Sequence, residues 1–177
     1  CKSTNIKDNR LRSSLFISIK GLNILIDVGP DFRQQALKLS NPKIEHILFT
    51  HFHRDHTAGL DDLRPIYYSN RMPLNLYCES NVCSAIEHDY KYIFSKIDYP
   101  GKPKFKLKKI DDTPFKIEDV SIYPIRVNHG SLPILGYRIG NLAYITDASF
   151  ICEEEKNKLL DLDILIINSL QRKKHVS

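Results

Sequence analysis

The sequence has no long apolar segment. Its longest apolar runs, such as residues 164 to 167, are far shorter than the ~20 residues that a membrane-spanning helix needs. No stretch has the apolar core of a secretory signal. The pattern therefore excludes a helical membrane protein, and we expect a cytoplasmic protein without a membrane partner.

Cysteine is scarce and irregularly spaced. The four cysteines are Cys1, Cys78, Cys83 and Cys152, and they form no C-x-x-C pair. A secreted scaffold built on disulfides would show a denser and more regular set. We therefore expect reduced thiols.

The length of 177 residues, with 42% hydrophobic and 27% charged residues, is sufficient for one globular domain with its own core. We predict a single domain over residues 1–177. The chain opens on Cys1 rather than Met and closes at Ser177 without a turn or cap, so we expect incomplete N- and C-termini. The net charge of +5 favours anionic ligands by electrostatic steering.

Short apolar segments alternate with helical patterns along the chain. Lys20-Gly21 separates two such segments and predicts a hairpin. We expect strands at 15–19, 22–27, 44–49, 74–78, 120–127, 137–140, 142–146 and 163–167, and helices at 31–39, 60–70, 80–95 and 153–160. This mixture predicts an α/β sandwich with helices outside two sheets.

Lysine alternates with apolar residues between positions 102 and 108. The lysines of one parity are Lys102, Lys104, Lys106 and Lys108. Such a row protects an edge strand against pairing with other chains, and it could also contact phosphates. No row of aromatic residues for base stacking accompanies it, so we favour the edge strand and rank nucleic acid as the less favoured partner.

The densest group of ligand-type residues follows the apolar run at 47–49. His51, His53, Asp55 and His56 lie within six positions. If the chain is still extended here, His51 and His53 point the same way and can bind one ion together. Asp55 and His56 follow once the backbone has turned, so they more naturally serve a second ion.

Three other predicted strands also end near a ligand-type residue. These residues are Asp27, His129 and Asp147. Such residues at four strand ends are what a shared cleft requires. We expect Asp27 to orient a ligating imidazole rather than bind metal. His46 and His88 lie outside the strand ends, and we interpret them as structural or solvated.

The spacing His-x-His-x-Asp-His after Thr50 and a buried strand resembles the signature of the metallo-β-lactamase-fold hydrolases. Segments 24–29, 127–129 and 144–147 are similar to that family as well. The likeness is strongest to the branch of phosphonate-pathway cyclic-phosphate phosphodiesterases, which are relatives of the tRNA 3′-processing endonucleases. It implies a metallo-β-lactamase-type αββα sandwich of two mixed sheets with helices on the outer faces, and it allows a homodimer.

The resemblance also implies a set of site residues. In the family a third histidine follows one strand and a bridging aspartate follows the next, which gives these roles to His129 and Asp147. Two divalent ions, zinc or manganese with iron as a further candidate, would be held by His51, His53, Asp55, His56, His129 and Asp147. Asp55 would also contact the nucleophilic water. His175 would assist phosphate binding or protonate the leaving group.

The sequence departs from that family at two points. The last metal-binding histidine of the family has no counterpart before Ser177, so the second ion has one ligand fewer. Cys1 could be the remnant of an N-terminal cysteine cluster that binds a structural zinc, but its partners are absent. We expect these residues to hold one ion, or to bind the pair weakly.

These features predict a metal-dependent hydrolase, and above all a phosphodiesterase that acts on a small or cyclic phosphodiester through a metal-bound hydroxide. The alternatives are a tRNA 3′-processing-type endonuclease, a lactone or thioester hydrolase, and a non-catalytic phosphate-binding module. We rank the endonuclease lower because the interval from His129 to Asp147 leaves no room for the substrate-gripping arm that many such nucleases insert there.

Overall fold

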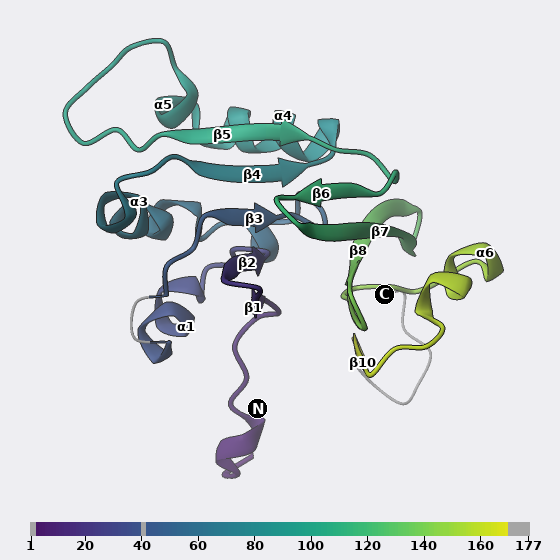
Figure 1. The fold of residues 1–177 in the computed structure, drawn as a ribbon. Helices are drawn as coiled ribbons and strands as arrows, with labels where there is room; N and C mark the ends of the chain where they lie inside the picture. Colours follow the sequence, from purple (N-terminus) through teal and green to yellow (C-terminus); the bar gives the residue numbers. More distant parts are fainter. Residues whose placement is uncertain (1–2, 40–41, 170–177) are drawn as a thin grey trace.

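The computed structural model describes residues 3–39 and 42–169, and these residues form two stacked β-sheets with flanking helices (Figure 1). The strands are β1 (Leu15–Ile19), β2 (Leu22–Ile26), β3 (His46–Leu48), β4 (Leu74–Cys78), β5 (Phe105–Lys109), β6 (Phe115–Ile117), β7 (Val120–His129), β8 (Leu132–Ile139), β9 (Leu142–Ile145) and β10 (Ile164–Ile167). The helices are α1 (Phe32–Lys38), α2 (Arg54–Thr57), α3 (Arg64–Asn70), α4 (Ser80–Asp89), α5 (Lys91–Phe94) and α6 (Glu153–Lys156), with the 3-10 turns η1 (Ile6–Asp8), η2 (Leu60–Leu63) and η3 (Asn157–Leu159).

The first sheet has the strand order β1-β2-β3-β4-β5, and the second has the order β10-β9-β8-β7-β6. In the first sheet β2, β3, β4 and β5 are parallel, so their carboxyl ends share one edge. In the second sheet β7 and β9 both run antiparallel to β8 and therefore parallel to each other. The architecture thus groups the ends of the strands that precede the predicted site residues.

Three apolar layers hold the sheets and helices together. Side chains of the first sheet, among them Ile47 and Leu76, pack against helix residues such as Ile86. A second layer lies between the sheets and contains Leu48 and Tyr137. A third layer covers the far side of the second sheet towards α6. The predicted sandwich of two mixed sheets with outer helices is confirmed.

Most predicted elements are present, but the helices expected over 60–70 and 153–160 are each partly 3-10 turns, and α2 was not predicted. The helix expected over 80–95 is interrupted at Tyr90, where the backbone leaves helical geometry and the chain continues as α5. The strand expected from Tyr137 begins at Leu132, because a tight turn pairs His129 with Leu132. β6 was not predicted, since three residues are too few for a periodic pattern.

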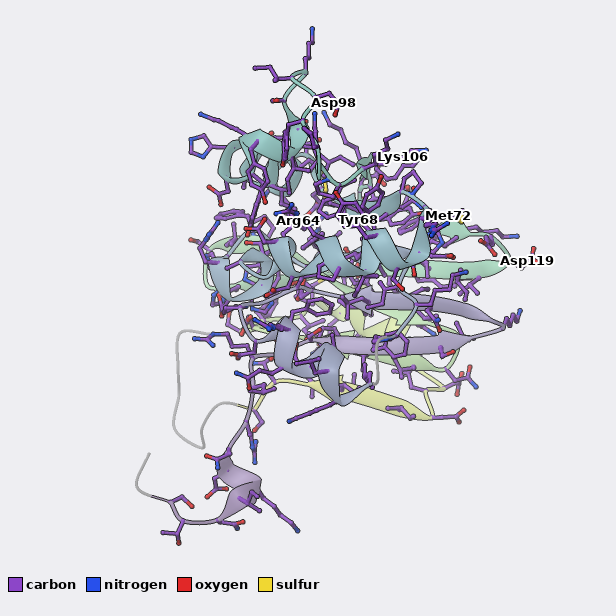
Figure 2. The ribbon with its side chains drawn as sticks, turned by 90° about the vertical axis from the view of Figure 1, so that its left-hand side faces the viewer. Arg64, Tyr68, Met72, Asp98, Lys106 and Asp119 are labelled. Carbon is purple, nitrogen blue, oxygen red and sulfur yellow. A yellow bond between two sulfur atoms is a disulfide. The ribbon has the colours of Figure 1, made fainter. Side chains whose placement is uncertain are left out.

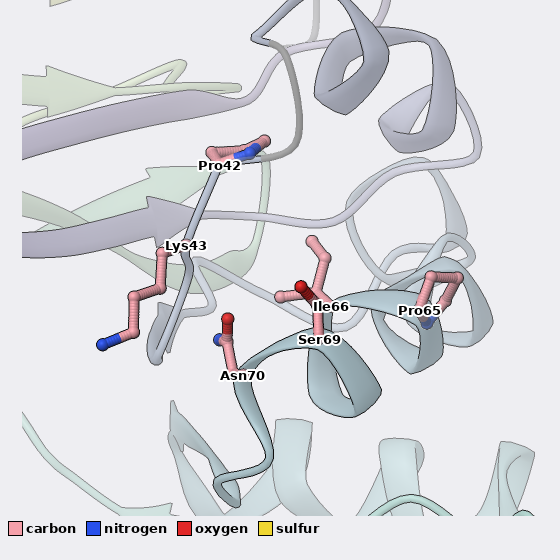
Figure 3. Close-up of a pocket in the computed structure, with 6 residues that line it drawn as sticks. All are labelled: Pro42, Lys43, Pro65, Ile66, Ser69 and Asn70. Carbon is pink, nitrogen blue, oxygen red and sulfur yellow. The ribbon is translucent and has the colours of Figure 1, made fainter.

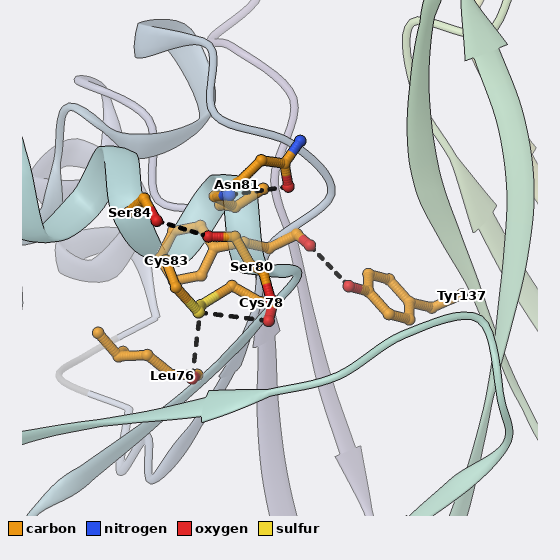
Figure 4. The surroundings of a disulfide bond; sticks show 9 residues. Leu76, Cys78, Ser80, Asn81, Cys83, Ser84 and Tyr137 are labelled. Carbon is orange, nitrogen blue, oxygen red and sulfur yellow. Dashed lines mark hydrogen bonds between the residues drawn. A yellow bond between two sulfur atoms is a disulfide. The ribbon is translucent and has the colours of Figure 1, made fainter.

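The expectation of reduced thiols is wrong for Cys78 and Cys83. Cys78 ends β4 and Cys83 lies in α4, and the tight connection between these elements brings their Cα atoms to 5.7 Å. This separation lies within the range for a disulfide, and the two sulfur atoms are bonded (Figure 4). Cys152 is a free thiol.

Within residues 3–39 and 42–169, no helix is both long enough and apolar enough to span a bilayer.

Candidate metal centre

The candidate site begins where β3 ends and the chain turns into α2. His51 and His53 are still extended, and His51 Nε2 lies 3.0 Å from His53 Nδ1. Between them, Phe52 packs against the apolar layer under the helices, while Arg54 pairs with Asp89 at 2.6 Å. Alternation along an extended chain therefore brings the two imidazoles together, as the sequence pattern predicts.

Thr50 connects the first imidazole to Asp27. The backbone N–H of Thr50 donates to Asp27 Oδ1 at 2.8 Å, and its hydroxyl donates to Asp27 Oδ2 at 2.7 Å. Because the hydroxyl proton of Thr50 is donated to Asp27, Thr50 Oγ1 accepts a hydrogen bond from His51 Nδ1 at 2.9 Å. This chain fixes the tautomer of His51 and leaves the lone pair of Nε2 free for a metal ion.

His56 lies between two carboxylates. Its Nδ1 is 2.7 Å from Asp27 Oδ2, and its Nε2 is 2.7 Å from Asp147 Oδ2 and 3.5 Å from Asp55 Oδ2. Asp27 is fully buried and has no exposure to solvent, whereas the side chain of Asp55 is 56% exposed. Asp27 therefore orients the ring from its buried side, and Asp55 lies on the solvent-exposed side of His56.

Two of the site carboxylates have strained backbones. Asp27 has φ 60° and Asp147 has φ 54°, the left-handed region that non-glycine residues rarely adopt. Such a conformation costs about 1–3 kcal/mol and is retained mainly at functional sites. The chain turns sharply at both strand ends, and the turns direct both carboxylates towards His56.

Two sets of three candidate ligands meet at His51. One set is His51, His53 and His129, and the other is His51, His56 and Asp147; the ligand atoms within each set lie within 4.8 Å of one another. Asp147 Oδ2 is also 3.9 Å from His51 Nε2. Buried His129 Nδ1 has no hydrogen-bond partner among the described residues. An orphaned nitrogen beside two other imidazoles fits a metal ion.

The model of the Beta-lactamase superfamily domain matches residues 22–176. The chain belongs to the beta-lactamase superfamily. The suspected kinship with metallo-β-lactamase-fold proteins is thereby confirmed. A crystal structure of a diphosphatase from the PhnP family superposes with a TM-score of 0.91 at 34% identity, covering 100% of this chain and 67% of that one. The short form of human tRNase Z superposes with a TM-score of 0.65 at 20% identity, over 87% of this chain and 70% of that one, which shows the fold alone.

Among curated proteins, an octanoyltransferase of Porphyromonas gingivalis is 44% identical over 180 residues, 100% of this chain and 36% of that protein. A ribonuclease Z of Thermococcus gammatolerans is 30% identical over 128 residues, 70% of this chain and 39% of that protein. The chain thus spans little more than a third of the length of these relatives. Their names describe proteins much longer than the matched part.

His51 and His56 have different charge states at neutral pH. Burial, together with the rings of His56 and His53, lowers the pKa of His51 to about 3, so His51 is neutral and able to bind a metal. Burial opposes a charge on His56, but hydrogen bonds to Asp147 and Asp27 raise its pKa to about 10. The hydrogen bond from His56 lowers the pKa of Asp147. An ion bound at His56 Nε2 therefore has to replace a proton.

This proton makes the metal-free protein sensitive to pH. The pKa of His56 in the folded protein, about 10, lies above its ordinary 6.5, so its ion pairs stabilise fully below pH 6.5. That stabilisation is lost as the pH rises through 10. We expect the melting temperature of chelator-treated protein to fall over this range, and to fall less in His56→Gln. The exposed His88 lies outside the site, so His88→Gln should follow the wild type. Equal pH dependence in the wild type and His56→Gln would contradict this assignment.

The structure places the remaining predicted residues as follows. His46 is buried beside Tyr77, with Nδ1 3.2 Å from its hydroxyl, and belongs to no ligand set. His88 is exposed next to Asp89. His175 and Cys1 lie outside the described residues. The roles of the six candidate ligands and of the two catalytic candidates stay predictions.

Sequence reasoning missed how the second sheet holds the histidine loop. The hydroxyl of fully buried Tyr137 donates to the carbonyl of Phe49 at 2.6 Å, and Leu135 N donates to the carbonyl of Thr50 at 3.1 Å. Both contacts join β8 to the residues directly before His51. A tyrosine in an apolar strand is the only sequence signal, and it does not identify its distant acceptor.

A hollow of about 350 Å³ lies elsewhere, between residues 42–43 and α3 (Figure 3). Its lining includes Lys43, Ile66 and Asn70 but neither histidine nor carboxylate. It lacks the groups for hydrolytic chemistry and is separate from the candidate metal centre.

Proposed function

We propose that the protein is a metal-dependent phosphodiesterase that acts on a small or cyclic phosphodiester. The observation that carries this proposal is the pair of ligand sets that share His51, with Asp147 beside both His51 and His56. Adjacent sites of this kind suit two ions about 3.5–4 Å apart, the arrangement used by many phosphate-ester hydrolases. The similarity to a diphosphatase over the whole chain supports the same class of substrate.

In this proposal some side chains bind the ions and others orient the ion-binding side chains. His51, His53 and His129 would hold one ion, and Asp55 with His56 would hold the second, with Asp147 between them. Bound ions would supply Lewis-acid stabilisation of phosphate charge and a nucleophile at neutral pH. Thr50 and Asp27 keep the imidazoles oriented. Asp55, exposed and 3.5 Å from His56, would also contact the nucleophilic water.

The donor set leaves zinc, manganese and iron as candidate ions, since imidazole and carboxylate groups bind all three. We propose a pair of ions, the second of which binds more weakly because this stretch supplies it with fewer ligands. A cytoplasmic location and a homodimer are parts of the same proposal. Elemental analysis of the complete protein counts the ions directly.

Hydrolysis of bis(p-nitrophenyl) phosphate tests the proposal. We expect the complete protein to turn it over with added zinc or manganese, and chelation to abolish turnover and lower the melting temperature, because ions that bind only the folded form stabilise it. His129→Ala should lose turnover, whereas His88→Ala, exposed and outside the site, should keep it. A chelator-resistant rate would overturn the metal-dependent mechanism.

Two other substrate classes are favoured by specific similarities. Ribonuclease Z relatives favour RNA 3′ processing, but β7 and β8 are joined by a tight turn and carry no inserted arm. Cleavage of a precursor tRNA at the rate of the small diester would reverse this ranking. The octanoyltransferase relative favours carboxylic esters as substrates. If the protein hydrolysed a p-nitrophenyl acyl ester faster than bis(p-nitrophenyl) phosphate, we would assign it as an ester hydrolase instead.

A further inference from the structure

β5 and the residue before it carry a row of exposed lysines on the face that points away from the helices. We propose that Lys104, Lys106 and Lys108, here called the lysine row, bind the phosphate backbone of a single-stranded nucleic acid. This inference goes beyond the proposed phosphodiesterase activity, because the row is separate from the candidate metal ligands. Figure 2 labels Lys106 at the surface of the molecule.

The position of the row follows from the register of the first sheet. Phe105 and Leu107 face the helices and belong to their apolar layer, so the lysines occupy the opposite face. Along that face one register row runs Ile26, Leu48, Tyr77, Lys108, and the next runs Ile24, His46, Asn75, Lys106. Ile24, Ile26 and Leu48 are buried between the sheets, whereas both rows end on an exposed lysine at β5.

The lysines of the row form no ion pair within the described part of the chain, and the acidic side chain that acts on both neighbouring residues, His46 and Tyr77, is Glu118. Elsewhere Lys43, Lys156 and Lys158 form ion pairs with glutamates. None of the three lysines of the row forms such a pair with a described residue, and all three are exposed. The nearest acidic residues along the chain are otherwise engaged, since Asp111 accepts hydrogen bonds from Thr113 and Asp112 approaches Arg126.

The spacing of the row suits a repeating anion. Alternate residues of a strand lie about 7 Å apart, comparable to successive phosphates of an extended nucleic acid strand. β5 is parallel to β3, and Lys108 is in register with Leu48 through Tyr77, so it lies two strand spacings, about 10 Å, from the strand that delivers the histidines. A strand bound along the row would therefore run towards the edge that holds the metal centre.

The contact we propose is to the backbone and does not read sequence. Tyr77, the aromatic residue beside Lys108, stacks on Phe115 with ring centroids 5.6 Å apart and is only partly exposed. Phe115 thus covers one face of its ring, and Tyr77 is the one aromatic residue among those described that is in register with the row. Binding should therefore be strongly salt-dependent and similar for different homopolymers.

Fluorescence anisotropy with a labelled twelve-nucleotide oligo-U tests this inference in the complete protein, with chelator present so that the metal centre plays no part. We expect K104Q/K106Q/K108Q to raise the Kd at low salt by at least about tenfold and to reduce the salt slope by about 2, since each contact to a single strand contributes about 0.7. The matched control is K7Q/K20Q/K38Q, which removes the same charge from exposed lysines distant from β5 and should bind like the wild type.

Several outcomes would overturn the inference. The first is that the wild type does not bind oligo-U, and the second is that both triple variants lose the same affinity. The third is that K104Q/K106Q/K108Q keeps its RNA affinity but self-associates. Stronger binding of the row to phosphatidylserine vesicles or to a poly-glutamate peptide than to RNA would assign it to another partner. Turnover of bis(p-nitrophenyl) phosphate should be unchanged in both triple variants, so failure here is distinguishable from failure of the proposed phosphodiesterase.

Discussion

Replacement of Asp147 by asparagine is expected to lower phosphodiester turnover by roughly 10²- to 10³-fold, the effect typical of losing one preorganised electrostatic contact. Asp147 Oδ2 lies 2.7 Å from His56 Nε2 and 3.9 Å from His51 Nε2, so it is the carboxylate beside the histidine that the two ligand sets share. An amide keeps the size of the side chain but removes the charge that two cations require. Initial rates with saturating and limiting manganese measure the effect.

The matched control is Asp119→Asn, which removes one negative charge from the exposed turn before β7. We expect its rate to equal that of the wild type. Elemental analysis of Asp147→Asn should show a loss of bound metal. A variant that keeps its ions and more than about a tenth of its rate would contradict the assignment of Asp147.

Replacement of Gly29 by alanine is expected to lower the free energy of unfolding by about 3 kcal/mol, the upper range for forcing an atom into a packed interior. A Cβ at Gly29 would overlap the backbone carbonyl of Asp55, and one at Gly59 would overlap the carbonyl of Gly29. The same loops are joined by hydrogen bonds from Val28 N to His56 O at 2.8 Å and from Gly59 N to Val28 O at 2.9 Å. The added methyl would therefore displace α2 together with Asp55 and His56.

Urea unfolding of Gly29→Ala and Gly59→Ala measures this effect, and both variants should also bind less metal. Gly140→Ala is the control, because a φ of 59° is strained for alanine but a Cβ there meets no atom within 4 Å. Its cost should be about 1–2 kcal/mol. If Gly29→Ala were no less stable than Gly140→Ala, the close packing of the two loops would be contradicted.

The features that could be predicted from the sequence are local ones. The pairing of His51 with His53 follows from alternation over two residues, and the turn that separates Asp55 and His56 follows within the same segment. The positions of Asp27, His129 and Asp147 at strand ends follow from the apolar runs before them. The sequence predicts that Asp27 orients an imidazole, but it does not identify His56 as the partner.

The features that escaped prediction depend on residues far apart in the chain. The hydrogen bond from Tyr137 to Phe49 spans 88 positions, and the packing of Gly29 on Asp55 depends on how two loops meet. The bond between Cys78 and Cys83 depends on the angle at which α4 leaves β4. A glycine or cysteine pattern does not specify these angles, so tertiary geometry decides them.

The candidate ligands reach the metal centre from both sheets, since the histidine loop follows β3 while His129 and Asp147 follow β7 and β9. Neither sheet can assemble the centre alone, so an ion held by residues of both would bind only after the sheets have docked. Such binding would then stabilise the docked form without being needed to build either sheet. Without the ion, the docked chain would be folded but less stable, and its transiently unfolded form would be more open to proteases.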